Sequence, residues 1–295
     1  MQYAIEVNNL CHHYGKRVIY EDLNFKVPGG KVFGLLGKNG VGKTTLIKIL
    51  MGFLRPTSGT CRILGDESHN LSPQTRRKVG LLFEGHLAYE FMSIQGVERF
   101  FAPFYPNWRR ELYYGLTDRL GLPKSHKIGN MSEGQRSQVV LGLIMAQQPE
   151  VMILDDYTMG LDAGYRRLFL DYLAEYLQEG GKTVLVTSHI VQDLEKFVDE
   201  VVFLERGGQA TQMPLQRFLG GFKQYCLPKD NGNQIPLQGS CLKNLEESGC
   251  NYLLYSFDDL DGVSRYLTEN NISCQGLKEM PMSFEDAFIG FTGRY

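Results

Sequence analysis

The 295-residue chain lacks paired cysteines, long apolar segments and a marked excess of charge of either sign. Its six cysteines are scattered and no two are spaced as C-x-x-C, so we expect neither a zinc site nor a disulfide framework, and a reducing cytosol fits. The longest apolar run, residues 139–146, contains Gly142 and is far too short to span a bilayer. A formal net charge of −2 gives no general attraction to nucleic acid or anionic lipid.

The first residues, 1–6, contain neither a basic segment nor an apolar core, so no signal peptide is expected. An apolar content of 43% and a charged content of 22% are typical of a globular protein. The length suffices for one large domain and a small one. If this protein works at a membrane, we expect it to do so through a partner.

One segment, residues 37–44, organises the rest of the chain. It reads Gly-Lys-Asn-Gly-Val-Gly-Lys-Thr and matches the phosphate-loop pattern G-x-x-x-x-G-K-[ST] in full. A short apolar run precedes it at residues 31–36, and an apolar-periodic stretch follows it at residues 45–51. That order predicts a strand, a glycine-rich loop and a helix.

The residue types in this loop suit phosphate binding. Gly37, Gly40 and Gly42 allow turns in which a side chain would clash. The freed N–H groups and the helix N-terminus then face phosphate oxygens. We expect Lys43 to pair with the β- and γ-phosphates and the Thr44 hydroxyl to ligate Mg²⁺.

Two further apolar runs predict buried parallel strands that end in polar residues. Residues 151–154 lead directly to Asp155 and Asp156, and residues 182–187 lead to Ser188 and His189. Ligands bind at the carboxyl ends of strands in open α/β sheets, so one carboxylate is expected to bind Mg²⁺ and the other to activate water. A lone histidine is usually structural, but this position favours a γ-phosphate contact.

Two other residues are weaker candidates on their own. Glu84 follows a predicted strand at residues 78–83, where a carboxylate can ligate a metal or orient its water, although a solvated loop acid is the ordinary interpretation. Tyr14 lies upstream of the phosphate loop and is a candidate to stack on an adenine ring. A tyrosine before a glycine turn more often packs in a core or on a surface.

Residues 130–146 predict a helix that Ser132 caps, with N–H groups and a hydroxyl presented to an anion. The stretch from residue 93 to residue 121 is helical in character and rich in aromatic residues. Two interpretations stay open for these rings, a helical core or an exposed groove for a partner. The rings concerned are Phe100, Phe101, Phe104, Tyr105, Trp108, Tyr113 and Tyr114.

The remaining core segments predict short strands at residues 4–7, 25–27 and 61–64 and a helix at residues 191–198 that leads into a strand at residues 201–204. Alternation of buried strands and helices predicts an α/β fold.

A different unit begins near residue 222. Its pattern predicts a strand at residues 251–257, a helix at 259–269, a strand at 272–277 and a capped helix at 283–291. From residue 222 to the end there are six Lys or Arg and ten Asp or Glu, a balance of 6 − 10 = −4. That charge argues against a nucleic-acid-binding appendage.

Together these motifs resemble the ATP-binding-cassette ATPases over about residues 3–220, in the family's order. Residues 37–44 are similar to the Walker A motif, 151–155 to Walker B and 131–135 to the LSGGQ signature. Residues 159–162 resemble the D-loop.

The resemblance implies the site residues. Lys43, Glu84, Asp156 and His189 would act in hydrolysis, and Thr44, Glu84 and Asp155 would hold Mg²⁺. The residues implied to bind ATP are Tyr14, Gly37, Lys38, Asn39, Gly40, Val41, Gly42, Lys43, Thr44, Thr45, Ser132, Gly134 and Gln135.

The implied fold is an α/β P-loop NTPase cassette at residues 1–220, with a RecA-like core, an antiparallel β subdomain and a helical subdomain at about 86–148. Residues 221–295 would form a small α+β accessory domain. The tail from Pro281 to Phe288 is similar to the C-terminal extension of bacterial exporter ATPases of the drug- and antibiotic-efflux type.

The resemblance also implies partners. Two copies would pair head to tail, with ATP between the phosphate loop of one and Ser132, Gly134 and Gln135 of the other. Closure would drive a separate integral-membrane permease. The chain would then be cytoplasmic and peripheral on the inner face of the cell membrane, with no nucleic-acid partner.

Four departures from the family pattern qualify this interpretation. Asp156 stands where the family has a catalytic glutamate, and Tyr157 stands where it has proline. Aspartate is shorter by one C–C bond, about 1.5 Å, so hydrolysis is expected to be slow unless the backbone compensates. Glu84 replaces a glutamine, and Glu133 replaces a signature glycine and is expected to face outward.

Two other functions compete with the exporter. Asp156 motivates an ATP-dependent dimerisation switch that hydrolyses slowly and has a non-transport or regulatory role. A nucleic-acid-associated cassette is disfavoured by the single cassette, the absence of a long coiled coil or zinc insertion and the acidic tail.

Overall fold

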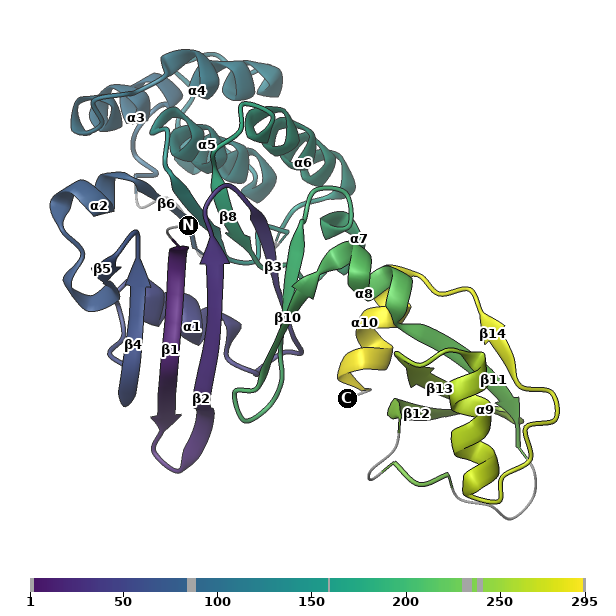
Figure 1. Ribbon diagram of the computed structural model, residues 1–295. Helices are drawn as coiled ribbons and strands as arrows, with labels where there is room; N and C mark the ends of the chain where they lie inside the picture. The colour runs from purple at the N-terminus through teal and green to yellow at the C-terminus, as the bar shows by residue number, and fades with distance from the viewer. Residues whose placement is uncertain (1–2, 84–88, 159, 230–234, 238–240, 294–295) are drawn as a thin grey trace. The chain divides into compact units, whose positions relative to one another are not determined.

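The computed structural model describes residues 3–83, 89–158, 160–229, 235–237 and 241–293 (Figure 1). The chain divides into two compact units, each described separately below. The first contains residues 1–193 and 197–212, and the second contains residues 194–196 and 213–295. None of the helices in the described ranges is long and apolar enough to cross a membrane.

A six-stranded sheet forms the centre of the first unit. Its strands run in the order β10-β9-β3-β8-β7-β6, and the pairs among β9, β3, β8, β7 and β6 are parallel. The residues of β3, β7 and β8 are fully buried, because a parallel sheet covered on both faces favours continuous apolar runs. The strands are β3 Val32–Leu36, β6 Val79–Leu82, β7 Val151–Leu154, β8 Thr183–Val186, β9 Glu200–Leu204 and β10 Ala210–Pro214. This sheet confirms the predicted α/β class.

A second, antiparallel sheet has the order β2-β1-β4-β5. Its strands are β1 Tyr3–Tyr14, β2 Arg17–Pro28, β4 Ser58–Ile63 and β5 Asp66–Glu67. The strands predicted at residues 4–7 and 25–27 were too short, since β1 and β2 each extend over 12 residues. Register shifts interrupt their alternation near Asn9 and Asp22, whose φ values are +47° and +60°, and so hide the longer strands from pattern analysis.

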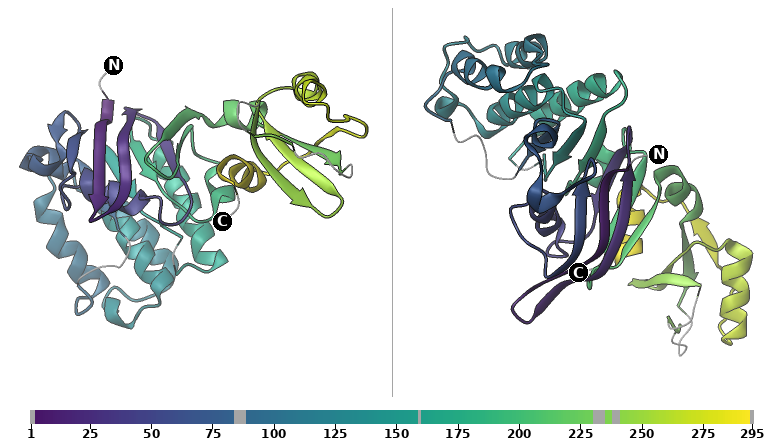
Figure 2. Two further views of the ribbon diagram at one scale, coloured as in Figure 1. Left: turned by 90° about the horizontal axis from the view of Figure 1, so that it is seen from below. Right: turned by 60° about the vertical axis from the view of Figure 1, so that its left-hand side comes forward.

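Helices pack beside both sheets. Helix α1, Lys43–Leu50, buries Leu46, Ile47, Ile49 and Leu50 in a cluster with residues of β1, β2 and β3. The other helices of this unit are α2 Pro73–Arg77, α3 Ile94–Phe101, α4 Arg110–Thr117, α5 Glu133–Ala146, α6 Ala163–Leu177 and α7 Val191–Leu194. Figure 2 shows α3, α4 and α5 gathered at one end of the unit, away from the turn that joins β1 and β2.

The helix predicted at residues 191–198 is wrong beyond Leu194. The chain turns there so that it can enter β9 beside β3. Asp199 anchors this turn, because its Oδ2 accepts a hydrogen bond of 2.8 Å from the backbone N–H of Val32.

The aromatic stretch divides into buried and exposed rings: the core interpretation is confirmed for Tyr113, and the groove for a partner stays a prediction. Tyr113 is fully buried in the cluster formed by α3, α4 and α5, and its hydroxyl donates to the carbonyl of Ile94 at 2.8 Å. Phe100 and Phe104 are 39% and 57% exposed. Trp108 is half-buried and donates from Nε1 to Glu98 Oε1 at 3.0 Å.

The second unit contains a four-stranded antiparallel sheet with the order β12-β13-β11-β14. Its strands are β11 Lys223–Pro228, β12 Leu242–Ser248, β13 Asn251–Ser256 and β14 Lys278–Met280. Its helices are α8 Leu215–Gly221, α9 Leu260–Glu269 and α10 Phe284–Thr292. Tyr225, Leu254, Val263 and Leu267 belong to its core.

The predicted helices of this unit are confirmed, and their caps are Asp259 and Ser283. The strand predicted at residues 272–277 is wrong. Ile272 is buried as expected of a strand, but Gly276 has a φ of +83° that turns the chain, and strand pairing begins only at Lys278. A buried apolar residue in a loop therefore produces the same sequence pattern as a short strand.

Candidate active site

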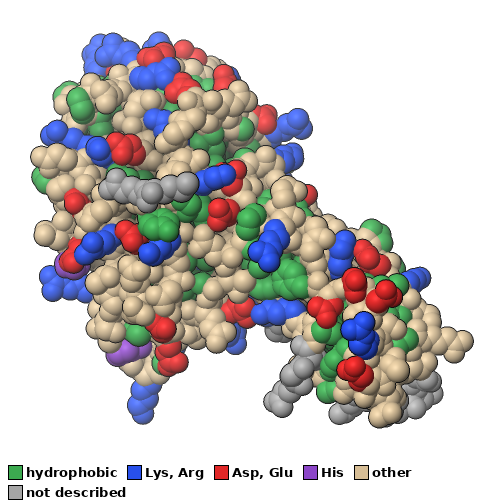
Figure 3. All heavy atoms as spheres, viewed as in Figure 1, with side chains coloured by type: hydrophobic (Ala, Val, Ile, Leu, Met, Phe, Trp, Pro, Cys, Tyr) green, Lys and Arg blue, Asp and Glu red, His purple; other side chains and the backbone are tan. Residues whose placement is uncertain are grey.

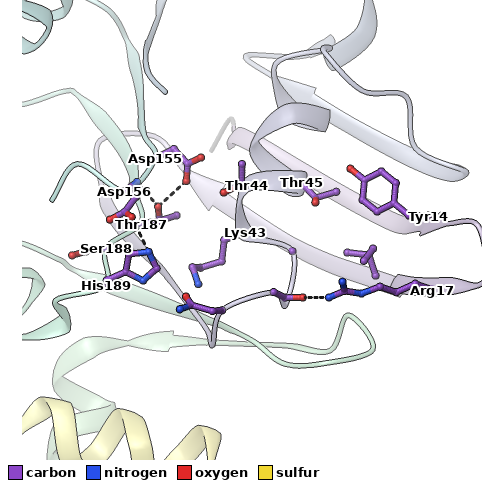
Figure 4. Close-up of a pocket in the computed structure, with 14 residues that line it drawn as sticks. Tyr14, Arg17, Lys43, Thr44, Thr45, Asp155, Asp156, Thr187, Ser188 and His189 are labelled. Atoms are coloured by element: carbon purple, nitrogen blue, oxygen red, sulfur yellow. Dashed lines mark hydrogen bonds and ion pairs between the residues drawn. The ribbon is translucent and has the colours of Figure 1, made fainter. Parts of the chain in front are cut away.

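A cleft of about 290 Å³ opens where the carboxyl ends of β7 and β8 meet the loop after β3 and the start of β2 (Figure 4). It contains residues from four separate segments of the first unit. The lining residues are Tyr14, Arg17, Ile19, Asn39, Gly40, Gly42, Lys43, Thr44, Thr45, Asp155, Asp156, Thr187, Ser188 and His189.

The predicted strand, loop and helix are confirmed around residues 37–42, between β3 and α1. Gly42 has a φ of +115°, and a Cβ there would lie 2.6 Å from the hydroxyl of Tyr20. That hydroxyl donates to the carbonyl of Gly42. A Cβ at Gly37 would lie 2.5 Å from the carbonyl oxygen of Leu204, a backbone atom that cannot move aside. Two glycines are thus required by close approach.

The loop curls around the ammonium of Lys43. Lys43 Nζ donates to the carbonyl of Gly37 at 2.6 Å and to the carbonyl of Lys38 at 3.1 Å. Burial lowers the pKa of Lys43, and the carboxylates of Asp156 and Asp155 act in the opposite direction. A partly desolvated cation interacts more strongly with an anion than a hydrated one does, so this position suits a phosphate group.

Thr187 connects the ends of β7 and β8. Its hydroxyl donates to Asp155 Oδ1 at 2.9 Å and accepts from the backbone N–H of Asp156 at 2.7 Å. Asp155 is 1% exposed, and the Thr44 hydroxyl group lies on the same cleft. A carboxylate and a hydroxyl are the hard oxygen ligands that Mg²⁺ prefers, so these residues fit that ion. Within the described ranges no group of three or more His, Cys, Asp or Glu side chains could hold a metal.

Two side chains contact the carboxylate of Asp156, in addition to the Thr187 hydroxyl that accepts from its backbone N–H. The backbone φ of Asp156 is +42°, in the left-handed region. The Thr158 hydroxyl donates to its Oδ1 at 2.9 Å, and its Oδ2 lies 2.7 Å from Nε2 of His189. The His189 side chain is 53% exposed, whereas that of Asp156 is only 11% exposed. The two residues predicted for water activation and the γ-phosphate contact therefore touch each other.

The signature residues do not line this cleft. Ser132 caps α5, where its Oγ accepts from the N–H of Gln135 at 3.3 Å and its own N–H donates to Gln135 Oε1 at 3.0 Å. Gly134 is buried against the ring of Tyr165, to which a Cβ would approach within 2.6 Å. Glu133 is exposed, as expected, and its carboxyl group lies over Gly160.

The other predicted residues are placed as follows. Tyr14 is 49% exposed on the cleft, and its ring meets that of His12 edge to face at 4.8 Å. Asn39, Gly40 and Thr45 line the cleft. Lys38 and Val41 belong to the loop, and Val41 is buried. Glu84 and Met159 lie outside the described residues.

Sequence reasoning missed Arg17, Ile19, Thr187 and Ser188, which also line the cleft. Arg17 donates from Nη2 to the carbonyl of Gly40 at 2.9 Å and so ties the start of β2 to the tip of the loop. Its position three residues after Tyr14 was the only available signal. Thr187 ends the predicted strand before His189, but nothing in the sequence indicates its contacts with both aspartates.

Comparison with known proteins gives the following likenesses. A family model described as "ABC transporter" matches residues 20–159. "Nod factor export ATP-binding protein I" of Rhizobium johnstonii is 26% identical over 311 residues, which cover 99% of this chain and 95% of that protein. "Uncharacterized ABC transporter ATP-binding protein YhcH" of Bacillus subtilis is 30% identical over 213 residues, 70% of this chain and 68% of that protein. A solved "ATP binding subunit of ABC transporter" has a TM-score of 0.64 and 25% identity over 73% of this chain and 91% of that one.

Proposed function

Because the chain belongs to the ABC transporter family, we propose that it is the ATP-binding and ATP-hydrolysing subunit that energises a membrane exporter. The observation that carries this proposal is the cleft, which joins the phosphate loop to Asp155, Asp156 and His189. The full-length likeness to Nod factor export proteins supports export as the direction of transport. We extend the cassette assignment to residues 1–220 and treat residues 221–295 as an accessory domain.

ATP would lie along the cleft from Tyr14 to His189. The ring of Tyr14 is exposed and faces the cleft, so it can stack on adenine. The N–H groups of residues 38–45 and the cation of Lys43 would bind the phosphates. Mg²⁺, held by Thr44 and Asp155, would neutralise phosphate charge when bound.

Hydrolysis requires a group that accepts a proton from the attacking water. Asp156 is the proposed base, since its carboxylate lies at the cleft beside His189. The water oxygen would attack the γ-phosphorus while one water proton passes to the Asp156 carboxylate. The bond from the γ-phosphorus to the bridging oxygen would break, and ADP would leave. His189 would donate a hydrogen bond to the γ-phosphate.

A second copy of the chain would complete the site. Ser132 is exposed at the N-terminus of α5, and neither it nor Gly134 nor Gln135 lines the cleft of its own chain. The end of a 14-residue helix is a favourable position for an anion. We therefore infer a head-to-tail homodimer in which these residues bind the γ-phosphate of ATP held by the partner.

The permease would dock on the exposed aromatic residues of the helical region. Phe91, Phe100 and Phe104 are 71%, 39% and 57% exposed, and the rings of Phe100 and Phe104 lie 5.7 Å apart. Exposed rings of this kind favour a protein partner. Figure 3 shows Lys and Arg interspersed with Asp and Glu over the viewed face, which argues against a continuous basic surface for nucleic acid on this face.

The exporter model is tested by docking. Phe100→Ala and Phe104→Ala together should reduce co-purification with the permease and leave ATP binding intact. Trp108→Ala is less suitable because Trp108 is half-buried and bonded to Glu98, so its loss would also disturb the core. Unchanged co-purification of the Phe100 and Phe104 variant would contradict the proposed docking surface.

The enzymatic part is tested by phosphate release from the full chain with Mg-ATP over a range of protein concentrations. We expect turnover that rises with concentration and is lost in Lys43→Ala and Asp156→Asn. A slow ATP-dependent dimerisation switch is the second candidate, which the short side chain of Asp156 favours. An ATP-bound wild-type dimer that persists for many minutes with Mg²⁺ present would favour the switch over the exporter.

A further inference from the structure

The turn after β7 contains an uncommon backbone conformation. Among the residues that line the cleft, Asp156 is the one non-glycine with a positive φ, at +42°. Aspartate is one of the few residue types that adopt this region with modest strain, because its short polar side chain bonds locally. Strain at an active site persists only where neighbouring contacts hold it.

The residue that follows also bears on this conformation. A proline at this position would drive the residue before it toward extended conformations. Tyr157 removes that restriction from Asp156. Its ring is 2% exposed and stacks on Phe169 of α6, with ring centroids 5.0 Å apart and planes at 16°. Tyr157 thus both permits the turn and anchors it to a helix.

The next residue holds the carboxylate itself. Thr158 is 7% exposed, and its hydroxyl donates to Asp156 Oδ1 at 2.9 Å. With Thr187 on the backbone N–H and His189 on Oδ2, the aspartate is bound at three atoms. Only the Thr158 contact comes from the same turn, so its loss would test the local geometry of residues 156–158 separately from the contacts made by β8 and the residues after it.

We infer that Tyr157 and Thr158 are positioning residues that allow the short side chain of Asp156 to serve as the base. The inference rests on the proposed ATPase function. An aspartate carboxylate falls about 1.5 Å short of a glutamate carboxylate on the same backbone. A left-handed Asp156 redirects the Cα–Cβ bond, and the Thr158 hydroxyl fixes the carboxylate orientation. The three residues therefore act as one compensated unit.

The first test uses Thr158→Val and Thr158→Ser in the full chain. Loss of the hydroxyl should lower kcat for ATP about ten- to a hundredfold and change KM by less than about twofold, because position and not ATP binding is affected. Thr158→Ser, which keeps the donor, should restore kcat to within about threefold of wild type. Thr117→Val is the matched control, since Thr117 is also buried and donates to the carbonyl of Tyr113 at 3.1 Å in α4.

The second test is a double-mutant cycle with Asp156→Glu and Tyr157→Pro. Each single change should lower kcat by at least about tenfold, because a longer side chain overshoots on the left-handed backbone and a proline forces Asp156 out of it. The double variant should recover to within about threefold of wild type, a coupling that independent residues would not show. The Thr158 pair keeps the inference testable if Tyr157→Pro does not fold.

The outcomes distinguish the positioning role of Tyr157 and Thr158 from the proposed ATPase function. The positioning inference would be overturned if Thr158→Val turned over ATP as fast as wild type. It would also be overturned if the effects of Asp156→Glu and Tyr157→Pro on kcat were additive. Either result would leave the proposed function intact. Absence of phosphate release from a wild-type chain that binds ATP would overturn the hydrolytic function together with the inference.

Discussion

Two turns at the carboxyl ends of β3 and β7, two strands that pair with β8 on either side, bend the backbone in different ways. The loop after β3 uses glycine, and its Gly40 and Gly42 have φ values of +78° and +115°. The turn after β7 uses Asp156 at +42°, held by Thr158, Thr187 and His189. The first turn depends on the absence of side chains, and the second depends on side-chain contacts.

This difference explains why one turn matches a known pattern in full and the other departs from it. The glycine loop leaves space in which backbone N–H groups can approach phosphate, and a Cβ is excluded by close approach at Gly37 and Gly42. In the proposed function the turn after β7 places one carboxylate, which is held by side-chain contacts of Asp156 with Thr158 and His189.

The largest expected effect comes from adding one methyl group to the loop. Gly42→Ala places a Cβ at a φ of +115° and 2.6 Å from the Tyr20 hydroxyl. We expect ATP affinity to fall at least about a hundredfold, since loop strain and lost phosphate contacts add. Isothermal titration with ATP measures this. Gly220→Ala, where nothing lies within 4 Å, is the control, and normal ATP binding by Gly42→Ala would contradict the steric argument.

The next effect concerns the turn after β7, where affinity and turnover should separate. Asp156→Asn and Asp156→Ala should both bind ATP as wild type does and lose hydrolysis by at least about a hundredfold. Their stabilities should differ, because asparagine tolerates a left-handed backbone and alanine is about 1 kcal/mol less favourable there. Urea unfolding compares the two variants. Equal free energies of unfolding would show that the positive φ of Asp156 carries no strain.

A smaller effect is expected where β2 supports the tip of the loop. Arg17→Ala removes the hydrogen bond of 2.9 Å to the carbonyl of Gly40. We expect KM for ATP to rise about three- to tenfold with kcat unchanged, which corresponds to about one hydrogen bond. The exposed neighbour Lys16 supplies the control variant Lys16→Ala. A fall in kcat at constant KM would assign Arg17 to the reaction step and not to the loop.

The family and the α/β fold were predictable because they depend on local patterns, and the comparisons confirm both. Residues 32–50 form the expected strand, loop and helix, and Ser132 caps α5 as expected. These features depend on neighbours in the sequence. The catalytic and binding roles of the individual residues stay predictions.

The parts that escaped prediction depend on distant contacts. The φ of Asp156 is set with Thr187, 31 residues away, and Arg17 meets Gly40 across 23 residues. Strands β11 and β12 were not predicted, since Lys-Gln-Tyr-Cys-Leu-Pro shows weak alternation and its pairing partners lie elsewhere in the chain. Exposure of Phe100 and burial of Tyr113 are likewise decided by packing and not by spacing.

The smallest expected effect tests how far side-chain contacts support the cleft at Tyr14. His12 lies beneath that ring, is 6% exposed, and neither ring nitrogen has a hydrogen-bond partner among the described residues. Burial lowers the pKa of His12 from its ordinary value of 6.5, with a smaller contribution from His13.

The unfolded chain then binds more protons below pH 6.5, so the free energy of unfolding should decline as the pH falls below that value and stay level above it. His12→Leu should flatten this decline. Each kcal/mol of stability that the wild type loses between pH 7 and pH 5 corresponds to a fall of about 2–4 °C in its Tm. Thermal unfolding of His12→Leu beside the exposed His13→Leu measures it. An identical pH dependence in wild type and His12→Leu would show that His12 is not the titrating group.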